Sequence, residues 1–248
     1  MTDRLLRTAT RTHSFSESVI REMTRVAREH DAITLAQGFP DFPAPQLLKD
    51  AACAAIQGDV NQYAITWGTA NLRNALSEKY AAMYDLEFDP EREITVTCGA
   101  TEAMAAVMLA TIDPGEEVIV FEPFYENYGP DAVLSQASPV FLPLEAPDYR
   151  VERDRLEAVV TPKTRAIVVN TPNNPTGRVF DRDELQAIAD ICREYDILAI
   201  TDEIYEHIYY ESEHLVLAGF EGMRDRTITV SGLSKTFSVT GWRVGTIM

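Results

Sequence analysis

The chain has 248 residues, which is enough for one large domain or a domain and a half. Its 39 acidic residues outnumber 22 lysines and arginines, and the net charge of −17 argues against nucleic acid or an anionic membrane as the main partner, because both select positive surfaces. The sequence has neither a signal-peptide pattern nor a run of about eighteen apolar residues that would predict a membrane span. We therefore expect a cytoplasmic protein.

The three cysteines, Cys53, Cys98 and Cys192, are far apart and lack the spacing of metal ligands. A sparse and odd set of cysteines is typical of reduced thiols in a cytosolic protein. We expect buried free thiols and no metal site.

The first third of the chain predicts helices joined by loops. Apolar residues recur at helical spacing in residues 16–30, 46–57 and 69–83. Glycine and prolines in residues 33–43 predict an ordered loop, which composition alone would interpret as a plain connector. A second loop, residues 61–68, is rich in aromatic side chains.

From residue 94 onward, short apolar and β-branched runs alternate with helical patterns. Asp181 precedes a predicted helix, and Glu184 lies three residues after Asp181. This spacing predicts a capping box at the start of the helix. The alternation predicts an α/β fold of three layers, in which a mostly parallel central sheet is covered on both faces. The expected strands are residues 94–97, 117–121, 140–142, 165–170, 197–201 and 227–230. One helix is expected to follow the first strand and end near residue 111. The other expected helices cover residues 125–136, 156–160 and 181–194.

Polar clusters follow the predicted strands. In sheets of this kind, ligands bind beyond the carboxyl ends of the strands, so we expect these clusters to converge on one crevice. The clusters are residues 99–101, 122–128, 170–177, 202–205 and 231–235.

Four features in or near these clusters suggest catalysis or ligand binding. Lys235 lies among small and hydroxyl residues, where an amine can lose its proton and act as a nucleophile, and Arg243 suits bidentate capture of a phosphate. Residues 99–101 open a helix after a strand, which favours an anion, although an ordinary N-cap at Thr101 explains the same pattern. Asp202 ends an apolar strand, and a buried acid there needs a partner or caps a helix.

Together these motifs occur in an order that resembles one known family. The chain is similar to the large domain of class I/II aminotransferases, which are pyridoxal-phosphate (PLP) enzymes of fold type I. The resemblance implies an N-terminal segment and helix at residues 1–40 and a PLP-binding large domain at residues 41–248. The matching motifs are Gly99-Ala100-Thr101, Asn173-Asn174-Pro175-Thr176-Gly177, Asp202-Glu203-Ile204-Tyr205, Ser234-Lys235-Thr236-Phe237 and Gly241-Trp242-Arg243-Val244-Gly245.

The resemblance implies a role for each residue around the cofactor ring. Lys235 would form a Schiff base with the cofactor aldehyde and then move the proton between the α-carbon and the cofactor C4′. Asp202 would pair with the pyridine nitrogen and keep it protonated, so that the ring can accept electrons. Tyr205 and Asn174 would hydrogen-bond the ring O3′, and Tyr125 would stack on the ring.

The same resemblance implies ligands for the phosphate, which are Ala100, Thr101, Ser234 and Arg243. Some relatives also carry a phosphate-binding serine three positions before the lysine. Here that position is Gly232, so we expect Ser231 or Ser234 to compensate.

Further contacts implied by the resemblance involve the substrate and a second subunit. Gly38 would contact the substrate through its backbone, and Asn174 would contact the substrate carboxylate. Tyr63 would reach the phosphate of a neighbouring subunit, so a homodimer with shared sites is expected. The Asn174–Pro175 bond is expected to be cis.

Relatives continue into a small C-terminal domain, which carries the arginine that binds the substrate α-carboxylate, whereas this sequence stops at Met248. We interpret the chain as a large domain without that small domain. Its expected activity is transfer of an amino group between an amino acid and a 2-oxo acid, in two half-reactions with pyridoxamine phosphate between them. The loop from Gln37 to Phe42, together with Tyr63 and Trp67, favours broad, aromatic or sulfur-containing substrates, unless these rings pack a dimer interface.

Two alternatives remain open at this point. A β-eliminating C–S lyase of the same fold would use nearly identical cofactor residues. A non-catalytic PLP-binding fragment, or an effector domain, would keep the cofactor residues without the reaction. A purely structural domain does not explain why Lys235, Asp202, Tyr205 and Arg243 occur together.

Overall fold

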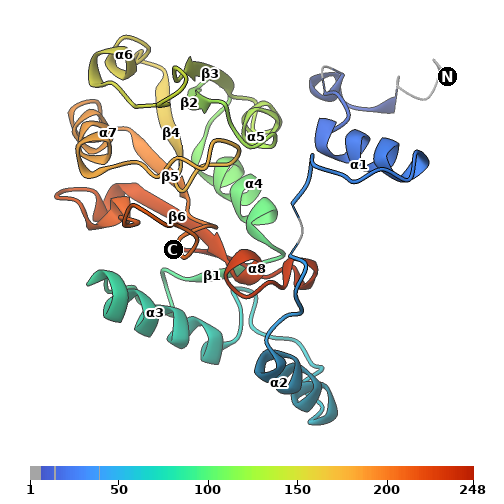
Figure 1. The fold of residues 1–248 in the computed structure, drawn as a ribbon. Coiled ribbons are helices and arrows are strands. Elements are labelled where there is room, and N and C mark those ends of the chain that lie inside the picture. The colour runs from blue at the N-terminus through green and yellow to red at the C-terminus, as the bar shows by residue number, and fades with distance from the viewer. Residues whose placement is uncertain (1–6, 14, 39) are drawn as a thin grey trace.

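The computed structural model describes residues 7–13, 15–38 and 40–248. It confirms the α/β prediction, because these residues form a mixed, mostly parallel sheet of seven strands in the order β1-β7-β6-β5-β4-β2-β3 (Figure 1). Strand β7 is antiparallel to both of its neighbours, and the other pairs are parallel. The strands are β1 (Thr95–Thr97), β2 (Glu117–Glu122), β3 (Ser138–Pro143), β4 (Thr164–Asn170), β5 (Leu198–Asp202), β6 (Thr227–Gly232) and β7 (Gly245–Ile247).

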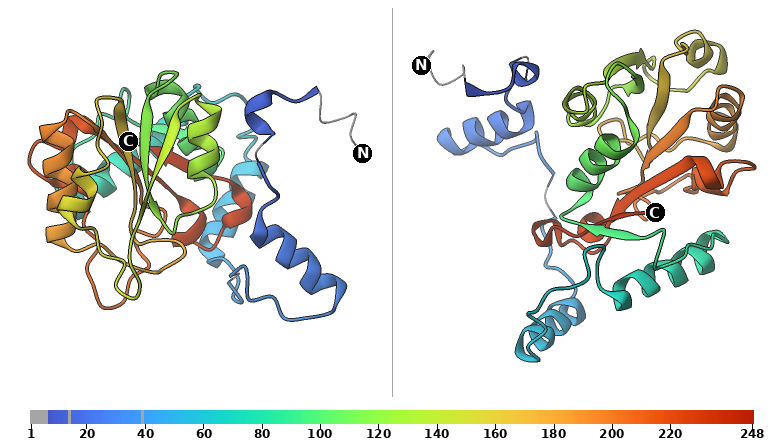
Figure 2. Two further views of the ribbon diagram at one scale, coloured as in Figure 1. Left: turned by 90° about the horizontal axis from the view of Figure 1, so that it is seen from above. Right: turned by 180° about the vertical axis from the view of Figure 1, so that it is seen from behind.

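Helices cover both faces of this sheet (Figures 1 and 2), which makes three layers. Alternate residues of each strand enter different cores: Ile119 of β2 packs with α7, whereas Val118 packs with α4. Burial on both faces explains why the sequences of the strands are continuous runs of apolar residues. The helices are α1 (Val19–Glu29), α2 (Gln46–Gln57), α3 (Ala70–Tyr84), α4 (Ala100–Thr111), α5 (Tyr128–Leu134), α6 (Arg153–Glu157), α7 (Arg182–Glu194) and α8 (Leu233–Thr236), with short 3-10 turns at Thr10–Thr12, Leu217–Gly219, Arg224–Arg226 and Thr240–Trp242.

A third core and a buried polar network attach α3 to the sheet edge formed by β1 and β7. Tyr80 of α3 is fully buried in the apolar part of this contact. Beside it, the Glu206 carboxylate accepts from Lys79 Nζ at 2.7 Å, from Tyr84 Oη at 2.8 Å and from Ser231 Oγ at 2.7 Å. Three hydrogen-bond donors stabilise this carboxylate and offset the free-energy cost of burying it. The network therefore fixes the turn after β5 against the end of β6.

The described residues from 7 to 66, here called the N-terminal arm, carry α1 and α2 away from the sheet (Figure 2). The arm exposes large apolar side chains; Leu35 is 93% exposed and Ile33 is 89% exposed. Many large apolar side chains exposed on one segment are more typical of an interaction site than of a solvent-facing chain.

The predicted capping box of α7 is confirmed, because Asp181 accepts from the Glu184 backbone and the Glu184 side chain accepts in return. Two helix predictions were wrong at their ends. Helix α5 begins at Tyr128 rather than Tyr125, since the chain turns through residues 123–127 after Pro123, which has no N–H to continue a ladder. Helix α6 ends at Glu157 and does not extend to residue 160.

The prediction of buried cysteines was also wrong for two of the three residues. Cys53 is exposed because it lies on α2 of the N-terminal arm, and Cys98 is exposed in the turn before α4. Cys192 is buried in the α7 core, and burial raises the pKa of its thiol to about 12. Within the described ranges, every helix is too short or too polar to cross a membrane.

Candidate active site

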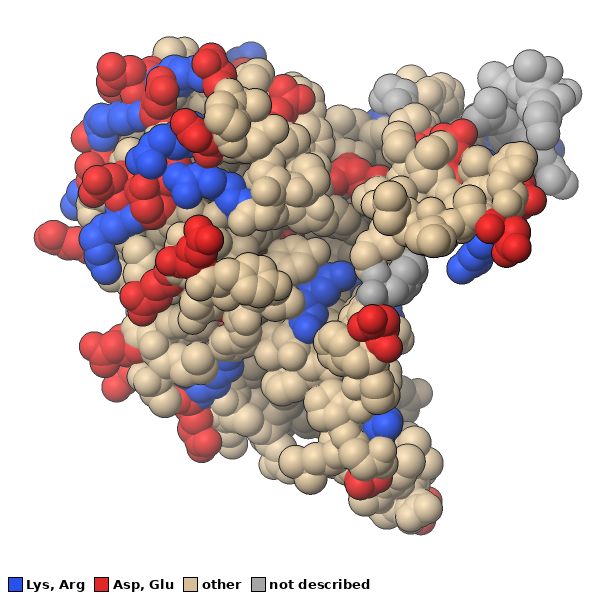
Figure 3. Space-filling view, viewed as in Figure 1, with Lys and Arg blue, Asp and Glu red and all other residues tan. Residues whose placement is uncertain are grey.

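The polar clusters at the strand ends converge as predicted on one cavity of about 830 Å³, here called the strand-end cavity. The surface is hollowed between the sheet domain and the arm (Figure 3). The predicted site residues that line this cavity are Gly38, Ala100, Thr101, Tyr125, Asn174, Asp202, Tyr205, Ser234, Lys235 and Arg243.

One end of the cavity is the N-terminus of α4. Gly99 occupies the N-cap with a φ of +85° and supplies no side-chain cap, so the first amides of α4, at Ala100 and Thr101, have no intrahelical acceptor. The Arg243 guanidinium lies so close to Gly99 that a Cβ there would overlap it. Uncapped amides, a helix dipole and a guanidinium form a site for an anion such as phosphate.

Close backbone approaches bring Arg243 to this position. A Cβ at Gly245 would overlap the Gly99 and Ala100 backbone, so only glycine lets β7 lie against the start of α4. Arg243 itself has a φ of +55°, in the left-handed region that non-glycine residues rarely adopt. Such conformations cost free energy and are concentrated at functional sites.

The other end of the cavity is built around Asp202, the last residue of β5. Its buried carboxylate accepts from Tyr128 Oη at 2.7 Å and from the Ile204 amide at 3.2 Å. Burial raises its pKa, and the Tyr128 hydrogen bond partly opposes this shift. An acid in this setting is stabilised as an anion once a cationic group approaches it.

A hydrogen-bond relay joins the ends of β4 and β5 to the loop after β4. Asn170 Nδ2 donates to the Asp202 carbonyl at 2.9 Å, and Asn170 Oδ1 accepts from the Asn174 amide at 2.8 Å. Burial raises the pKa of the Tyr205 hydroxyl, and the nearby Asn174 side chain partly opposes this shift. The Asn174–Pro175 bond is cis, as predicted.

Lys235 lies on α8 between the two ends. Its Nζ is 5.7 Å from the centre of the Tyr205 ring. Burial lowers its pKa, and the positive charge of Arg243 lowers it further. Both effects favour the neutral amine, which is the nucleophilic form.

The structure separates the two serines expected to compensate for Gly232. Ser231 Oγ donates to Glu206 in the buried network and does not line the cavity, whereas Ser234 does. A side chain at Gly232 would lie 2.6 Å from the Val244 carbonyl oxygen, so no serine fits there.

The aromatic side chains that were expected near the substrate do not all line the cavity. Phe42 lines the strand-end cavity, but Trp67 does not, and its ring lies 6.0 Å from the Arg73 guanidinium instead. Tyr63 is fully exposed on the arm and lies outside the cavity of its own chain. Among the described residues of the aromatic set, only Phe42 lines the cavity of its own chain, and Phe39 lies outside the described residues.

Sequence reasoning missed three residues that the structure places at the cavity. Tyr128 holds Asp202, Asn170 joins two strand ends, and Ser238 presents a buried hydroxyl with no hydrogen-bond partner. Tyr128 lies three residues after Tyr125, within the polar cluster at residues 122–128, and this position could have indicated it. In the part of the chain that the structure describes, no cluster of His, Cys, Asp or Glu has the geometry of a metal site.

Several solved structures with this architecture are aminotransferases. The N-succinyldiaminopimelate aminotransferase from Mycobacterium tuberculosis superposes with a TM-score of 0.94 at 42% identity, over 97% of this chain and 63% of that chain. The aspartate aminotransferase from Thermus thermophilus with maleate gives a TM-score of 0.92 at 34% identity, over 97% and 64%.

A family model described as aminotransferase class I and II matches residues 30–248, and the chain belongs to that family. A probable N-succinyldiaminopimelate aminotransferase DapC of M. tuberculosis H37Rv is 44% identical, over 96% of this chain and 61% of the relative. Human kynurenine--oxoglutarate transaminase 3 is 41% identical, over 96% and 55%. The chain thus spans about three-fifths of the length of these relatives.

Proposed function

We propose that this chain provides the cofactor-binding part of a PLP-dependent aminotransferase, which moves an amino group between an amino acid and a 2-oxo acid. One observation carries the proposal: Lys235, Asp202 and Arg243 line one cavity together with the uncapped N-terminus of α4. In this reading residues 1–40 form an N-terminal segment and residues 41–248 the large domain.

The donor set fits PLP at each functional group of the cofactor. The anion site of α4 and Arg243 would hold the phosphate, and the Arg243 guanidinium can lie beside α4 because Gly99 has no side chain. The buried Asp202 carboxylate would hold the protonated ring nitrogen, and Tyr205 with Asn174 would reach the ring oxygen. Ala100, Thr101 and Ser234 would complete the phosphate contacts, and Tyr125 would cover the ring.

The chain's own residues supply attachment, proton transfer and orientation. When bound, PLP withdraws electrons from the α-carbon of the substrate. Lys235 Nζ, whose pKa is lowered by burial and by the charge of Arg243, would attach the cofactor and would take the proton from that α-carbon. Asn174 would contact the substrate carboxylate and the Gly38 backbone would contact the substrate, which would orient it, and orientation supplies a large part of the rate.

The exposed arm supports a homodimer with shared sites. Tyr63 is fully exposed, its sequence neighbours Val60 and Ile65 are also exposed, and Leu35 and Ile33 expose further apolar surface elsewhere on the arm. A second copy would bury this surface and bring Tyr63 to the phosphate of its partner. The free, exposed thiols of Cys53 and Cys98 support a reducing compartment, the cytoplasm.

The proposal is tested by adding substrates to the PLP-loaded chain and following visible absorbance. An amino acid should bleach the absorbance and a 2-oxo acid should restore it, because the amino group is carried from one to the other. Release of pyruvate and ammonia from a cysteine conjugate, without dependence on a 2-oxo acid, would instead indicate the lyase.

The hydrogen bond from Tyr128 to Asp202 yields a prediction for cofactor affinity. Tyr128→Phe removes a bond that lowers the Asp202 pKa, so the neutral acid is favoured and the cationic ring nitrogen is held less well. We expect PLP to bind about tenfold more weakly, the usual scale for a hydrogen bond to a charged group. Fluorescence titration with PLP measures the change.

Tyr84→Phe is the matched control for Tyr128→Phe. It removes another tyrosine–carboxylate bond, to Glu206 at 2.8 Å, outside the strand-end cavity. Equal loss of PLP affinity in both variants would contradict a local role for Tyr128.

The charge of Arg243 yields a prediction for pH dependence. Arg243→Gln removes a cation that lowers the Lys235 pKa, so this pKa should rise. Attachment of pyridoxal, which lacks the phosphate that Arg243 would bind, requires the neutral amine. Its rate profile should therefore shift to higher pH in Arg243→Gln, as measured by absorbance stopped-flow.

Arg92→Gln is the control for this shift, since the Arg92 side chain is 86% exposed and lies outside the cavity. An unchanged profile in Arg243→Gln would show that burial alone sets the Lys235 pKa.

A further inference from the structure

Two segments that carry site residues lie beyond the end of the pairing between β5 and β6. This parallel pairing ends at Asp202 and Val230. One further backbone bond follows it, from the Glu203 amide to the Val230 carbonyl. The chain after β5 carries Tyr205, and the chain after β6 carries Lys235. The pairing of β5 with β6 therefore does not by itself fix these two side chains relative to each other.

A buried hydrogen bond between Ser231 and Glu206 joins the two segments. Glu206 directly follows Tyr205, and Ser231 lies four residues before Lys235. Ser231 Oγ donates to Glu206 Oε1 at 2.7 Å and lies 3.4 Å from the Glu203 carbonyl oxygen, so one hydroxyl contacts two residues of the turn after β5. Ser231 and Glu206 are each 2% exposed, and a hydrogen bond to a charged group is strong where water is excluded.

The two oxygens of the Glu206 carboxylate have different partners. Oε1 accepts from Ser231 Oγ and from Lys79 Nζ, both at 2.7 Å, whereas Oε2 accepts from Tyr84 Oη at 2.8 Å. Lys79 and Tyr84 both belong to α3, so this helix orients the carboxylate that Ser231 binds from β6. The bond from Tyr84 can be removed without removing the bond from Ser231.

The charge of Glu206 does not act directly on the two site residues. Burial and the nearby Asp202 raise the pKa of Tyr205, and Glu206 does not contribute to that shift. Burial and Arg243 lower the pKa of Lys235, again without a contribution from Glu206. An effect of Glu206 on either residue therefore comes through geometry. The relevant separation is that of Lys235 Nζ from the centre of the Tyr205 ring, 5.7 Å.

We propose that Ser231 and Glu206 are positioning residues for cofactor attachment. The bond between them holds the Lys235 amine beside Tyr205, so that both side chains can reach one cofactor. This inference rests on the proposed function, because attachment requires the amine to lie next to a ring that Tyr205 and Asp202 hold. Neither Ser231 nor Glu206 lines the strand-end cavity, so both act through the residues that do.

The test is the rate at which pyridoxal attaches to Ser231→Ala, measured by absorbance stopped-flow across a range of pH. The substitution removes the bond, so the limiting rate at high pH should fall about tenfold or more, because a small misplacement of reacting groups is costly. The midpoint of the pH profile should not move, since burial and Arg243 shift the Lys235 pKa. Calorimetric titration with inorganic phosphate should also be unchanged, because the anion site of α4 and Arg243 keeps its residues.

Tyr84→Phe is the matched control within the same network, because it removes the donor to Glu206 Oε2 and keeps the bond from Ser231. It should attach pyridoxal at the wild-type rate. Equal slowing in Ser231→Ala and Tyr84→Phe would overturn the proposal. A wild-type rate in Ser231→Ala would overturn it too, because the bond would then serve only the stability that denaturant unfolding measures. A shifted midpoint would show that the network acts through charge, and would also count against positioning.

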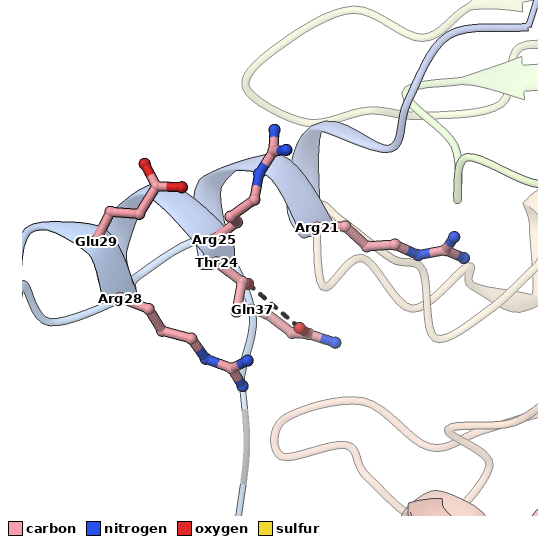
Figure 4. Close-up of a pocket in the computed structure, with 6 residues that line it drawn as sticks. All are labelled: Arg21, Thr24, Arg25, Arg28, Glu29 and Gln37. Atoms are coloured by element: carbon pink, nitrogen blue, oxygen red, sulfur yellow. Dashed lines mark hydrogen bonds between the residues drawn. The ribbon is translucent and has the colours of Figure 1, made fainter.

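Glu206→Gln tests the same bond if Ser231→Ala does not fold. It keeps the shape of the side chain but removes the charge from the acceptor of Ser231, so the rate should fall in the same direction. Glu29→Gln is its control, since the exposed Glu29 side chain extends from the end of α1 (Figure 4) and lies outside the strand-end cavity. Equal rates in Glu206→Gln and the wild-type chain would then overturn the proposal. Failure of the proposed function is seen separately, as the absence of Lys235-dependent absorbance when PLP is added to the wild-type chain.

Discussion

Lys235→Ala should abolish the visible absorbance that PLP acquires on attachment to the wild-type chain, and amino acids should no longer change the spectrum. The chain would lose its only amine placed between the α4 anion site and Asp202, among the residues that line the strand-end cavity. Loss of the proton-transfer group alone should slow any residual amino-group transfer about a hundredfold or more. Absorbance spectra with PLP, before and after addition of an amino acid, measure both effects.

Lys163→Ala is the control, because this lysine is exposed and lies outside the cavity. PLP can react with any accessible lysine, so the control should keep the wild-type spectrum. If Lys235→Ala also keeps it, another lysine attaches the cofactor and the assignment of Lys235 is wrong.

Gly245→Ala should both destabilise the fold and weaken PLP binding. The new Cβ would overlap the backbone of Gly99 and Ala100, and backbone on both sides cannot move aside as a flexible side chain can. Overpacking of this kind costs about 3 kcal/mol. Any relaxation would also pull Arg243 away from the start of α4. Denaturant unfolding and PLP titration measure the two losses.

Gly241→Ala offers a matched comparison four residues earlier, where a Cβ would meet no atom within 4 Å. It should leave both quantities nearly unchanged. Equal stability of Gly245→Ala and the wild-type chain would contradict the close packing of β7 against α4.

Local patterns predicted most of the sheet and most of the cavity. Strands that are buried on both faces have continuous apolar sequences, which can be recognised directly. Parallel strands bring their carboxyl ends to one edge of the sheet. The clusters around Gly99, Asn174, Asp202 and Lys235 could therefore be expected to meet. The capping box of α7 is local as well. These features depend on spacing within a few residues, which a sequence displays directly.

The features that could not be predicted depend on neighbours from distant parts of the chain. The insertion of β7 between β1 and β6 is a choice among pairings that no local pattern records. Ser231 turns away from the cavity because Glu206, with Lys79, offers it a buried partner. Tyr128 can donate its hydrogen bond to Asp202 only because α5 packs beside the end of β5.

The pairing of Gly232 with Gly245 has a consequence for how a ligand meets the site. These two residues lie opposite each other in neighbouring strands, and the segment between them carries both Lys235 and Arg243. The segment is thus a loop closed at its base, and its conformational entropy is lost during folding, before any ligand arrives. Both cations are presented as one preorganised unit, so motion of the arm would change access to the cavity but not the spacing between amine and guanidinium.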